Sequence, residues 1–195
     1  MEILGYAYGI LVVKGVKSKS SIHVETSDEF LQSIAKQKLS ILGEIKTYKR
    51  QRLSGKTSEI IVLKISQESI DLKLGRREWD VPSRAFTSND FRRGFLRSVF
   101  DFAGSLKARK RKGRKERAMR LCSVNENGLK KIKELLRMEG IKSIVYKSGN
   151  NFVLEIFGKH NLQLYLEKIG FENQNKKILM EKLLDPVNFD FICST

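Results

Sequence analysis

Basic side chains gathered in one short stretch are the residues of this sequence with the clearest chemistry. Between Ser105 and Arg120 there are nine lysines and arginines and one acid, Glu116. This window carries a net charge of +8, half of the +16 of the whole 195-residue chain. Groups of this kind at this density bind polyanions, so we expect nucleic acid as the first partner class and an acidic membrane surface as the second. A solvated, tail-like tip or a localisation signal is the alternative interpretation of the same run.

Histidine and cysteine are too few to form a metal centre or a catalytic triad. His23 and His160 are the only histidines, and Cys122 and Cys193 lie 71 residues apart. Two such cysteines make neither a metal-binding pair nor a disulfide framework, which indicates a reducing, cytoplasmic location. We therefore expect no bound metal and no cofactor.

One acidic pattern has the form used by some metal-dependent nucleases. Asp28 is followed at a distance by Glu44 and Lys46, which gives an acid, a second acid, one intervening residue and a lysine. Carboxylate oxygens suit magnesium. A chain that is 31% charged produces this short pattern by chance, however, and Glu44 follows a helix stop, where acids are common. We base no prediction on it.

The composition indicates a folded chain that carries these side chains on a packed core. Hydrophobic residues make up 41% of the sequence, which excludes disorder as the main state. No apolar run approaches the 18 or so residues of a membrane span, and the apolar N-terminus lacks the basic start and cleavage site of a signal peptide. We expect no membrane partner.

The chain repeats itself at an offset of 89 residues. Both halves contain the same spacing of small residues, with three residues between the first and second and five between the second and a final glycine. The pattern occurs as Gly5-Gly9-Gly15 and as Gly94-Ser98-Gly104. Each pattern predicts a helix that ends at its last glycine, in the left-handed stop typical of helix C-termini, and the second helix is expected to start near Thr87, with Asp90 in a capping box. Small residues on one face allow close helix approach, so we expect the two helices to pack on each other through Gly5, Gly9, Gly94 and Ser98.

Matching elements follow each of these helices in the same order. In the first copy, a hairpin at 16–26 is followed by a helix that Ser27-Asp28 opens and Gly43 closes. In the second copy, a hairpin at 105–123 is followed by a helix that Asn125 opens and Gly140 closes. A second hairpin and a short helix ending at Gly75 or Gly170 complete each copy. Each copy is thus αββαββα, and the offset grows to 97 at Gly140, which places eight extra residues in the basic hairpin of the second copy.

Alternation along the strands predicts which basic residues face away from the core. With Ile45, Ile61 and Leu63 facing inward, the outward face of the first copy is basic and aromatic. In the second copy Leu106 and Ala108 face inward. The hairpin tip is expected to contact phosphates, which position the protein on the nucleic acid without reading its sequence. The predicted nucleic-acid-binding residues are Lys14, Lys46, Tyr48, Arg50, Arg52, Lys64, Lys107, Arg109, Arg111, Lys112, Arg114, Lys115, Arg117 and Arg120.

The sequence resembles the LAGLIDADG family over nearly its whole length. Residues 95–106, FLRSVFDFAGSL, are similar to the family motif, and residues 7–15, AYGILVVKG, are similar to a more divergent copy. The order of elements, present twice, is the more specific part of the resemblance. It implies an α+β fold of two αββαββα repeats related by a pseudo-twofold axis, with packed central motif helices. It also implies saddle-shaped antiparallel sheets that grip duplex DNA or structured RNA.

The chain departs from the family where its metal-binding acids should be. In the family an acid directly precedes the last glycine of the motif and binds a divalent metal, but these positions are Lys14 and Ala103 here. Neither can ligate magnesium, while two-metal cleavage needs carboxylates to hold the ions about 4 Å apart. Asp101 keeps a carboxylate two positions earlier, which points it about 200° around the helix axis. We expect no catalytic residue, with Asp101 as the weak candidate, and Lys14 in direct contact with a phosphate.

These observations predict a monomer with an internal pseudo-dimer that binds nucleic acid and has lost nuclease activity. The predicted divisions are 1–75 and 91–184 for the two repeats, 76–90 for the linker and 185–195 for a tail. An active, magnesium-dependent LAGLIDADG endonuclease, an RNA maturase and a module that docks on an acidic protein are the alternatives. The choice between duplex DNA and structured RNA stays open at this level.

Overall fold

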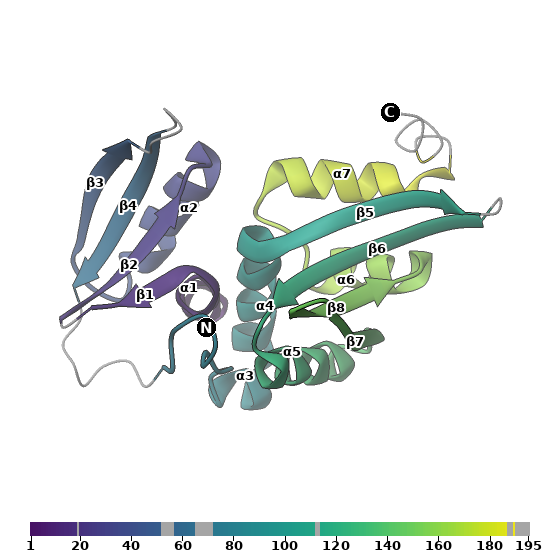
Figure 1. Cartoon of the computed structure of the whole chain (residues 1–195), viewed down its shortest axis with the longest axis horizontal. Helices are drawn as coiled ribbons and strands as arrows, with labels where there is room; N and C mark the ends of the chain where they lie inside the picture. The colour runs from purple at the N-terminus through teal and green to yellow at the C-terminus, as the bar shows by residue number, and fades with distance from the viewer. Residues whose placement is uncertain (19, 52–56, 65–71, 112–113, 187–188, 190–195) are drawn as a thin grey trace. The chain divides into compact units, whose positions relative to one another are not determined.

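The computed structural model describes residues 1–18, 20–51, 57–64, 72–111, 114–186 and 189. Within this part, the fold is α+β, with seven helices and two four-stranded antiparallel sheets (Figure 1). The chain divides into two compact units, Met1–Phe102 and Ala103–Thr195. None of the helices in the described part combines the length and hydrophobicity that a bilayer crossing requires.

The first unit contains one four-stranded sheet and the helices that pack with it. Its strands are β1 (Gly15–Lys17), β2 (Ser21–Thr26), β3 (Ile45–Gln51) and β4 (Thr57–Lys64), in the order β1-β2-β4-β3. Helices α1 (Glu2–Lys14) and α2 (Glu29–Leu39) pack on this sheet. Helix α3 (Arg84–Thr87) precedes α4 (Asn89–Ala103), whose last residue begins the second unit.

The second unit repeats this sheet topology with longer strands. Its strands are β5 (Gly104–Arg111), β6 (Arg114–Ser123), β7 (Ser143–Ser148) and β8 (Asn151–Phe157), in the order β5-β6-β8-β7. Helices α5 (Glu126–Met138), α6 (Lys159–Lys168) and α7 (Gln174–Leu184) all contact this sheet or each other (Figure 1). The predicted order of elements is confirmed in this copy, with α7 as an addition.

The strand registers define an inner and an open face for each sheet, because residues paired directly across antiparallel strands share a face. In the first sheet Val24 pairs with Ile61 and Ile22 with Leu63, and all four are buried. In the second sheet Met119 pairs with Ile156 and Leu121 with Leu154, again all buried. The helices cover these inner faces, so the opposite face of each sheet is the one that presents polar side chains.

Helices α1 and α4 approach each other at the small residues that the sequence singles out. A Cβ added to Gly5 would meet the carbonyl oxygen of Phe91, and one added to Gly94 would meet that of Glu2, both well inside 3.0 Å. A Cβ on Gly9 would meet the hydroxyl of Ser98. Real Cβ atoms do not come this close to other atoms. The predicted packing of the two motif helices is therefore present, and it requires residues without a side chain at these positions.

Local capping follows the predicted signals with one correction. Asp28 and Asn125 accept backbone hydrogen bonds at the starts of α2 and α5, as their positions predict. Helix α4 begins at Asn89 with the Ser88 hydroxyl accepting from the amide of Phe91, so the predicted cap at Thr87 is wrong. The hydroxyl of Thr87 instead donates to the Arg84 carbonyl oxygen in α3.

The predicted helix stops Gly15 and Gly104 do not have a left-handed backbone. Gly140 and Gly170 have φ of 80° and 68°, as a glycine stop requires. Gly15 has φ of −72° and an extended backbone, because it begins strand β1 directly. Its lack of a side chain serves close packing instead, since an added Cβ would clash with the carbonyl oxygen of Leu11. The short helix predicted to end at Gly75 falls largely on residues 65–71, outside the described residues, and 72–74 are not helical.

The boundary between the compact units differs from the predicted repeat boundary. Helix α4 opens the second repeat in sequence, yet nearly all of it belongs to the first compact unit. The reason is its packing against α1, which buries Phe91, Phe95 and Phe100. The division into repeats stays a prediction about the sequence pattern.

Of the two cysteines, Cys122 is a free, exposed thiol, and Cys193 lies outside the described residues.

Candidate nucleic-acid interface

The open face of the first sheet carries the predicted basic and aromatic residues. Lys46, Tyr48 and Arg50 alternate along β3, and Lys46 pairs with Val62 of β4, two residues before Lys64. These four side chains therefore share the face away from the buried Ile61 and Leu63, and all four are exposed. The predicted Arg52 lies outside the described residues.

Acidic groups accompany each base of this face. Arg50 lies 3.9 Å from the carboxylate of Glu25, while Lys46 and Lys64 lie 4.0 and 3.3 Å from that of Glu44. Exposed pairs of this kind contribute little to stability. They reduce the net positive charge of the face. Its lysines and arginine are therefore present mainly as ion pairs and not as free cations.

The open face of the second sheet gathers Lys107, Arg109 and Arg120. The register pairs Lys107 with Ala118, Arg109 with Glu116, and Ser105 with Arg120, so the predicted outward orientation of the three bases is confirmed. Arg109 forms an ion pair with Glu116. Lys107 is exposed and has no ion-pair partner among the residues that the structure describes. It is the free cation of this face in the described part of the chain.

Arg120 is held by Glu155 of the neighbouring strand β8, and Tyr146 of β7 holds that carboxylate. Its Nε donates to Oε2 of Glu155 at 2.6 Å, and the Tyr146 hydroxyl donates to the same oxygen at 2.8 Å. Partial burial and the Glu155 carboxylate raise the pKa of Tyr146 above its usual value of 10.0, so its hydroxyl stays a donor at neutral pH. The carboxylate is thus fixed from two sides, and the guanidinium is fixed by the carboxylate.

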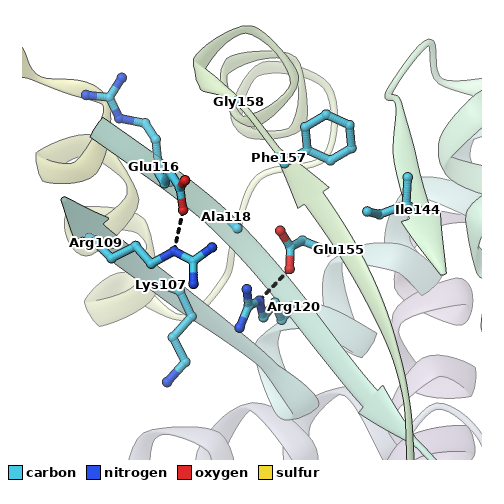
Figure 2. Close-up of a pocket in the computed structure, with 11 residues that line it drawn as sticks. Lys107, Arg109, Glu116, Ala118, Arg120, Ile144, Glu155, Phe157 and Gly158 are labelled. Carbon is cyan, nitrogen blue, oxygen red and sulfur yellow. Dashed lines mark hydrogen bonds and ion pairs between the residues drawn. The ribbon is translucent and has the colours of Figure 1, made fainter. Parts of the chain in front are cut away.

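A hollow lies on this face beside the arginine and has a volume of about 490 Å³. Its walls combine the charged groups of β5, β6 and β8 with two apolar side chains, Ile144 and Phe157 (Figure 2). Figure 2 shows the side chains of Arg120 and Glu155 directed toward each other across β6 and β8. Ile144, on the edge strand β7, is 43% exposed, and Phe157, the last residue of β8, is 42% exposed, so this face presents apolar surface beside its charged groups.

The two open faces carry different chemistry at equivalent positions. The row that runs His23, Val62, Lys46 across the first sheet corresponds to the row Arg120, Glu155, Ile144 across the second. Tyrosine is shared, as Tyr48 and Tyr146, and Lys64 is replaced by Phe157. The two faces therefore present different patterns of charge and apolar surface.

Arg117 does not belong to the open face. It pairs with Ala108 and alternates with the buried Met119, which puts it on the inner face of β6. Its guanidinium lies 4.5 Å from the ring centroid of Phe189. Arg117 is also among the residues that line the hollow, so its binding role stays a prediction. The structure says nothing of the tip side chains: Lys112 lies outside the described residues, and for Arg111, Arg114 and Lys115 only the backbone is described.

The last residues of α1 and α4 are the two that the resemblance places where the family has its acids. Lys14 is the last residue of α1 and Ala103 the last of α4, and a glycine that begins a strand follows each. Lys14 is half-buried, with no ion-pair partner in the described ranges. In the second unit the ammonium of Lys176 donates to the carbonyl oxygen of Gly104 at 2.7 Å, so a second cation lies beside the end of α4.

Asp101 is placed where it cannot serve a metal. Its side chain is fully buried, and Oδ2 accepts a hydrogen bond of 2.7 Å from the hydroxyl of Tyr6. Tyr6 is itself 1% exposed. A lysine and a methyl group at the motif ends, with the nearest acid buried in the α1–α4 contact, do not fit a divalent metal, and we derive no chemistry through one.

The other acidic pattern has structural roles. Oδ1 of Asp28 accepts from the amide of Leu31 at 3.1 Å and caps α2, while Glu44 pairs with Lys46 and Lys64. Within the described ranges, no group of three or more histidine, cysteine, aspartate or glutamate side chains is placed to hold a metal ion.

Comparison with known protein families and solved structures shows which proteins share this fold. Residues 90–170 match the family of LAGLIDADG-like domains. This match supports a LAGLIDADG-like domain in that part of the chain, and the two-sheet fold agrees with it. No curated protein matches the sequence.

Solved structures with the same fold cover both halves of the chain. Full-length DUF199/WhiA from Thermatoga maritima is 15% identical with a TM-score of 0.64, over 98% of this chain and 65% of that one. The homing endonuclease I-WcaI, bound to its DNA recognition sequence, is 10% identical with a TM-score of 0.63, over 95% and 87%. I-DmoI in complex with DNA and Mn is 11% identical with a TM-score of 0.57, over 87% and 96%. The chain thus spans about two thirds of full-length WhiA, and at these identities the likeness shows the fold alone.

Sequence reasoning missed the residues that organise the second open face, namely Glu155, Tyr146, Ile144 and Phe157. A signal was present, because Glu155 and Phe157 alternate with the inward Leu154 and Ile156 along β8. A single acid in an apolar strand indicates which of the alternating residues face outward. Its partner Arg120, however, comes from a strand 35 residues away in the sequence.

Proposed function

We propose that this chain binds duplex DNA through the open faces of its two sheets and does not cleave it. The observation that carries the proposal is the open face of the second sheet, where Lys107, Arg109 and Arg120 surround a hollow with polar and apolar walls. Proteins with the same fold hold DNA in their solved structures, which supports duplex DNA as the ligand class. The side chains of Lys14 and Ala103 support binding without metal-assisted cleavage.

Fluorescence anisotropy with a labelled DNA duplex, over a range of salt concentrations, tests this function. Phosphate contacts release counterions, so the logarithm of affinity should fall with the logarithm of salt concentration by about 0.9 for each phosphate neutralised. The same duplex incubated with magnesium or manganese should stay intact. Cleavage of the duplex, or affinity for structured RNA alone, would contradict the proposal.

The hairpin tip should supply much of this salt dependence because of its charge. We expect glutamine at the five tip positions Lys110, Arg111, Lys112, Arg114 and Lys115 to flatten the salt slope by about 0.9 for each phosphate that is no longer neutralised. A matched control removes the same charge from the far side of the second unit, where exposed bases lie on α5 and just after it: Lys130, Lys131, Lys133, Arg137 and Lys142. Equal slopes for the two variants would show that net charge alone matters.

Lys14 should contact a phosphate where the family has a metal-binding acid. We expect Lys14→Ala to weaken DNA binding and to lower the salt slope by about 0.9, the effect of one phosphate contact. Lys17→Ala is the matched control, because Lys17 is exposed three residues later on strand β1. If Lys14→Ala changes only stability, by the fraction of a kilocalorie per mole that a cation at a helix C-terminus contributes (roughly 0.3–1 kcal/mol), the lysine serves the helix dipole instead.

A further inference from the structure

The second open face holds one arginine in a way that suits the edge of a base. The Nε of Arg120 is engaged by Glu155, and no described residue bonds its two terminal amino groups. Its side chain is 29% exposed and that of Glu155 15% exposed, so the pair is partly shielded from water but open toward the hollow. The arginine therefore presents two donors in a fixed direction, with little rotamer freedom left to lose on binding.

The surroundings of Arg120 disfavour a phosphate as its ligand. The Glu155 carboxylate lies 2.6 Å from Nε, and Glu116 lines the same hollow. At Arg120 itself an incoming phosphate would meet the carboxylate of Glu155, whereas a base edge carries no net charge. Lys107 forms no ion pair within the described ranges and is the better phosphate ligand.

Two parallel donors match one base in particular. In the major groove guanine presents two acceptors, O6 and N7, while adenine presents an acceptor and a donor. Arginine with two free amino groups pairs with guanine in the bidentate manner. A-form RNA has a major groove too deep and narrow for side chains to read, so this mode selects a DNA duplex.

The apolar walls extend the same recognition by one base. Ile144 lies directly across the strand from Glu155, and Phe157 is two residues further along β8 on the same face. Both are more than 40% exposed. Thymine presents its 5-methyl group in the major groove, and apolar side chains contact this group.

We propose that Arg120, positioned by Glu155 and Tyr146, reads a guanine in the major groove of a DNA duplex, and that Phe157 and Ile144 contact the methyl group of a neighbouring thymine. This inference rests on the proposed function and adds its base preference. The first sheet has His23, Val62 and Lys46 in the equivalent row, so the contact assigned to Arg120 belongs to one half of the target.

Selection from a library of random DNA duplexes tests the inference. The unmodified chain should enrich sequences with a guanine next to a thymine at one position. Arg120→Ala should lose that guanine preference by about 10- to 100-fold while it still binds duplexes. Lys107→Ala is the matched control on the adjacent strand, and it should weaken all duplexes alike and keep the base preference.

Modified DNA tests the contacts without altering the protein. Replacing the selected guanine by 7-deazaguanine removes the N7 acceptor and should weaken binding about tenfold for the unmodified chain, but not for Arg120→Ala. Replacing the neighbouring thymine by deoxyuridine should weaken binding several-fold, and Phe157→Ala should abolish that difference. Tyr146→Phe should reduce the guanine preference without changing the salt slope, as a positioning residue requires.

The outcomes separate the inference from the proposed function. If duplexes are bound without a guanine preference, or if Arg120→Ala keeps it, the assignment of Arg120 is wrong while duplex binding stands. If no duplex is retained, and a protein or an RNA is bound instead, both the assignment and the proposed function are wrong.

Discussion

Replacing Gly94 by alanine should destabilise the first unit, although alanine is the better helix former. The added Cβ would fall on the carbonyl oxygen and carbon of Glu2 and within 3.0 Å of the amide nitrogen of Tyr6. All three atoms are backbone, so α1 and α4 must separate to make room. Overpacking of this kind costs about 1–3 kcal/mol or more, which exceeds the gain of about 1 kcal/mol in helix propensity.

Urea denaturation, followed by the loss of helical circular dichroism, measures this effect. Gly5→Ala should behave like Gly94→Ala, because its Cβ would meet the carbonyl oxygen of Phe91. Ser33→Ala is the control, since Ser33 is exposed in the middle of α2 and the change should be close to neutral. A Gly94→Ala chain as stable as the parent would contradict the close approach of the two helices.

Removing the Tyr6 hydroxyl should also destabilise the chain, and more than an average substitution. Tyr6→Phe keeps the ring but deletes the donor to a fully buried carboxylate, which costs about 1–3 kcal/mol. The free energy of unfolding measures the loss. Tyr8→Phe is the matched control, because Tyr8 lies on the same helix, is only half-buried, and no hydrogen bond to its hydroxyl is found among the described residues.

The same hydrogen bond decides between a structural and a catalytic Asp101. A buried acid that ties α1 to α4 predicts that Asp101→Ala lowers the midpoint of unfolding and leaves duplex DNA uncut, as in the parent. The endonuclease alternative predicts magnesium-dependent nicking by the parent chain that Asp101→Ala abolishes at unchanged protein stability. That second result would return Asp101 to the catalytic residues and overturn binding without cleavage.

Much of the fold could be predicted from local signals alone. The small residues at fixed spacing identified α1 and α4, and the polar residues Asp28 and Asn125 placed the starts of α2 and α5. Strand alternation identified Lys46, Lys107 and Arg120 as outward residues. Such features depend on residues close in sequence, whose periodicity is set by the geometry of one helix or one strand.

At two residues the residue type suggested one arrangement and the structure shows another. Arg117 has the same parity as the buried Met119, so alternation along β6 places it on the inner face, while its charge suggested the basic tip. Gly15 was expected in a left-handed turn, but it enters strand β1 directly. A glycine tolerates both backbone conformations, so its presence after a helix does not distinguish a turn from a strand.

What the sequence determined by itself is the order of elements, their faces, and the chemical character of the residues at the helix ends. Only the tertiary structure decided that Glu155 and Tyr146 hold Arg120, that carboxylates accompany the bases of the first sheet, and that Asp101 is buried against Tyr6. These pairs join residues from different strands or helices. Their formation depends on the strand order β5-β6-β8-β7 and on the approach of α1 to α4, which follow from burial of the whole core rather than from any local pattern.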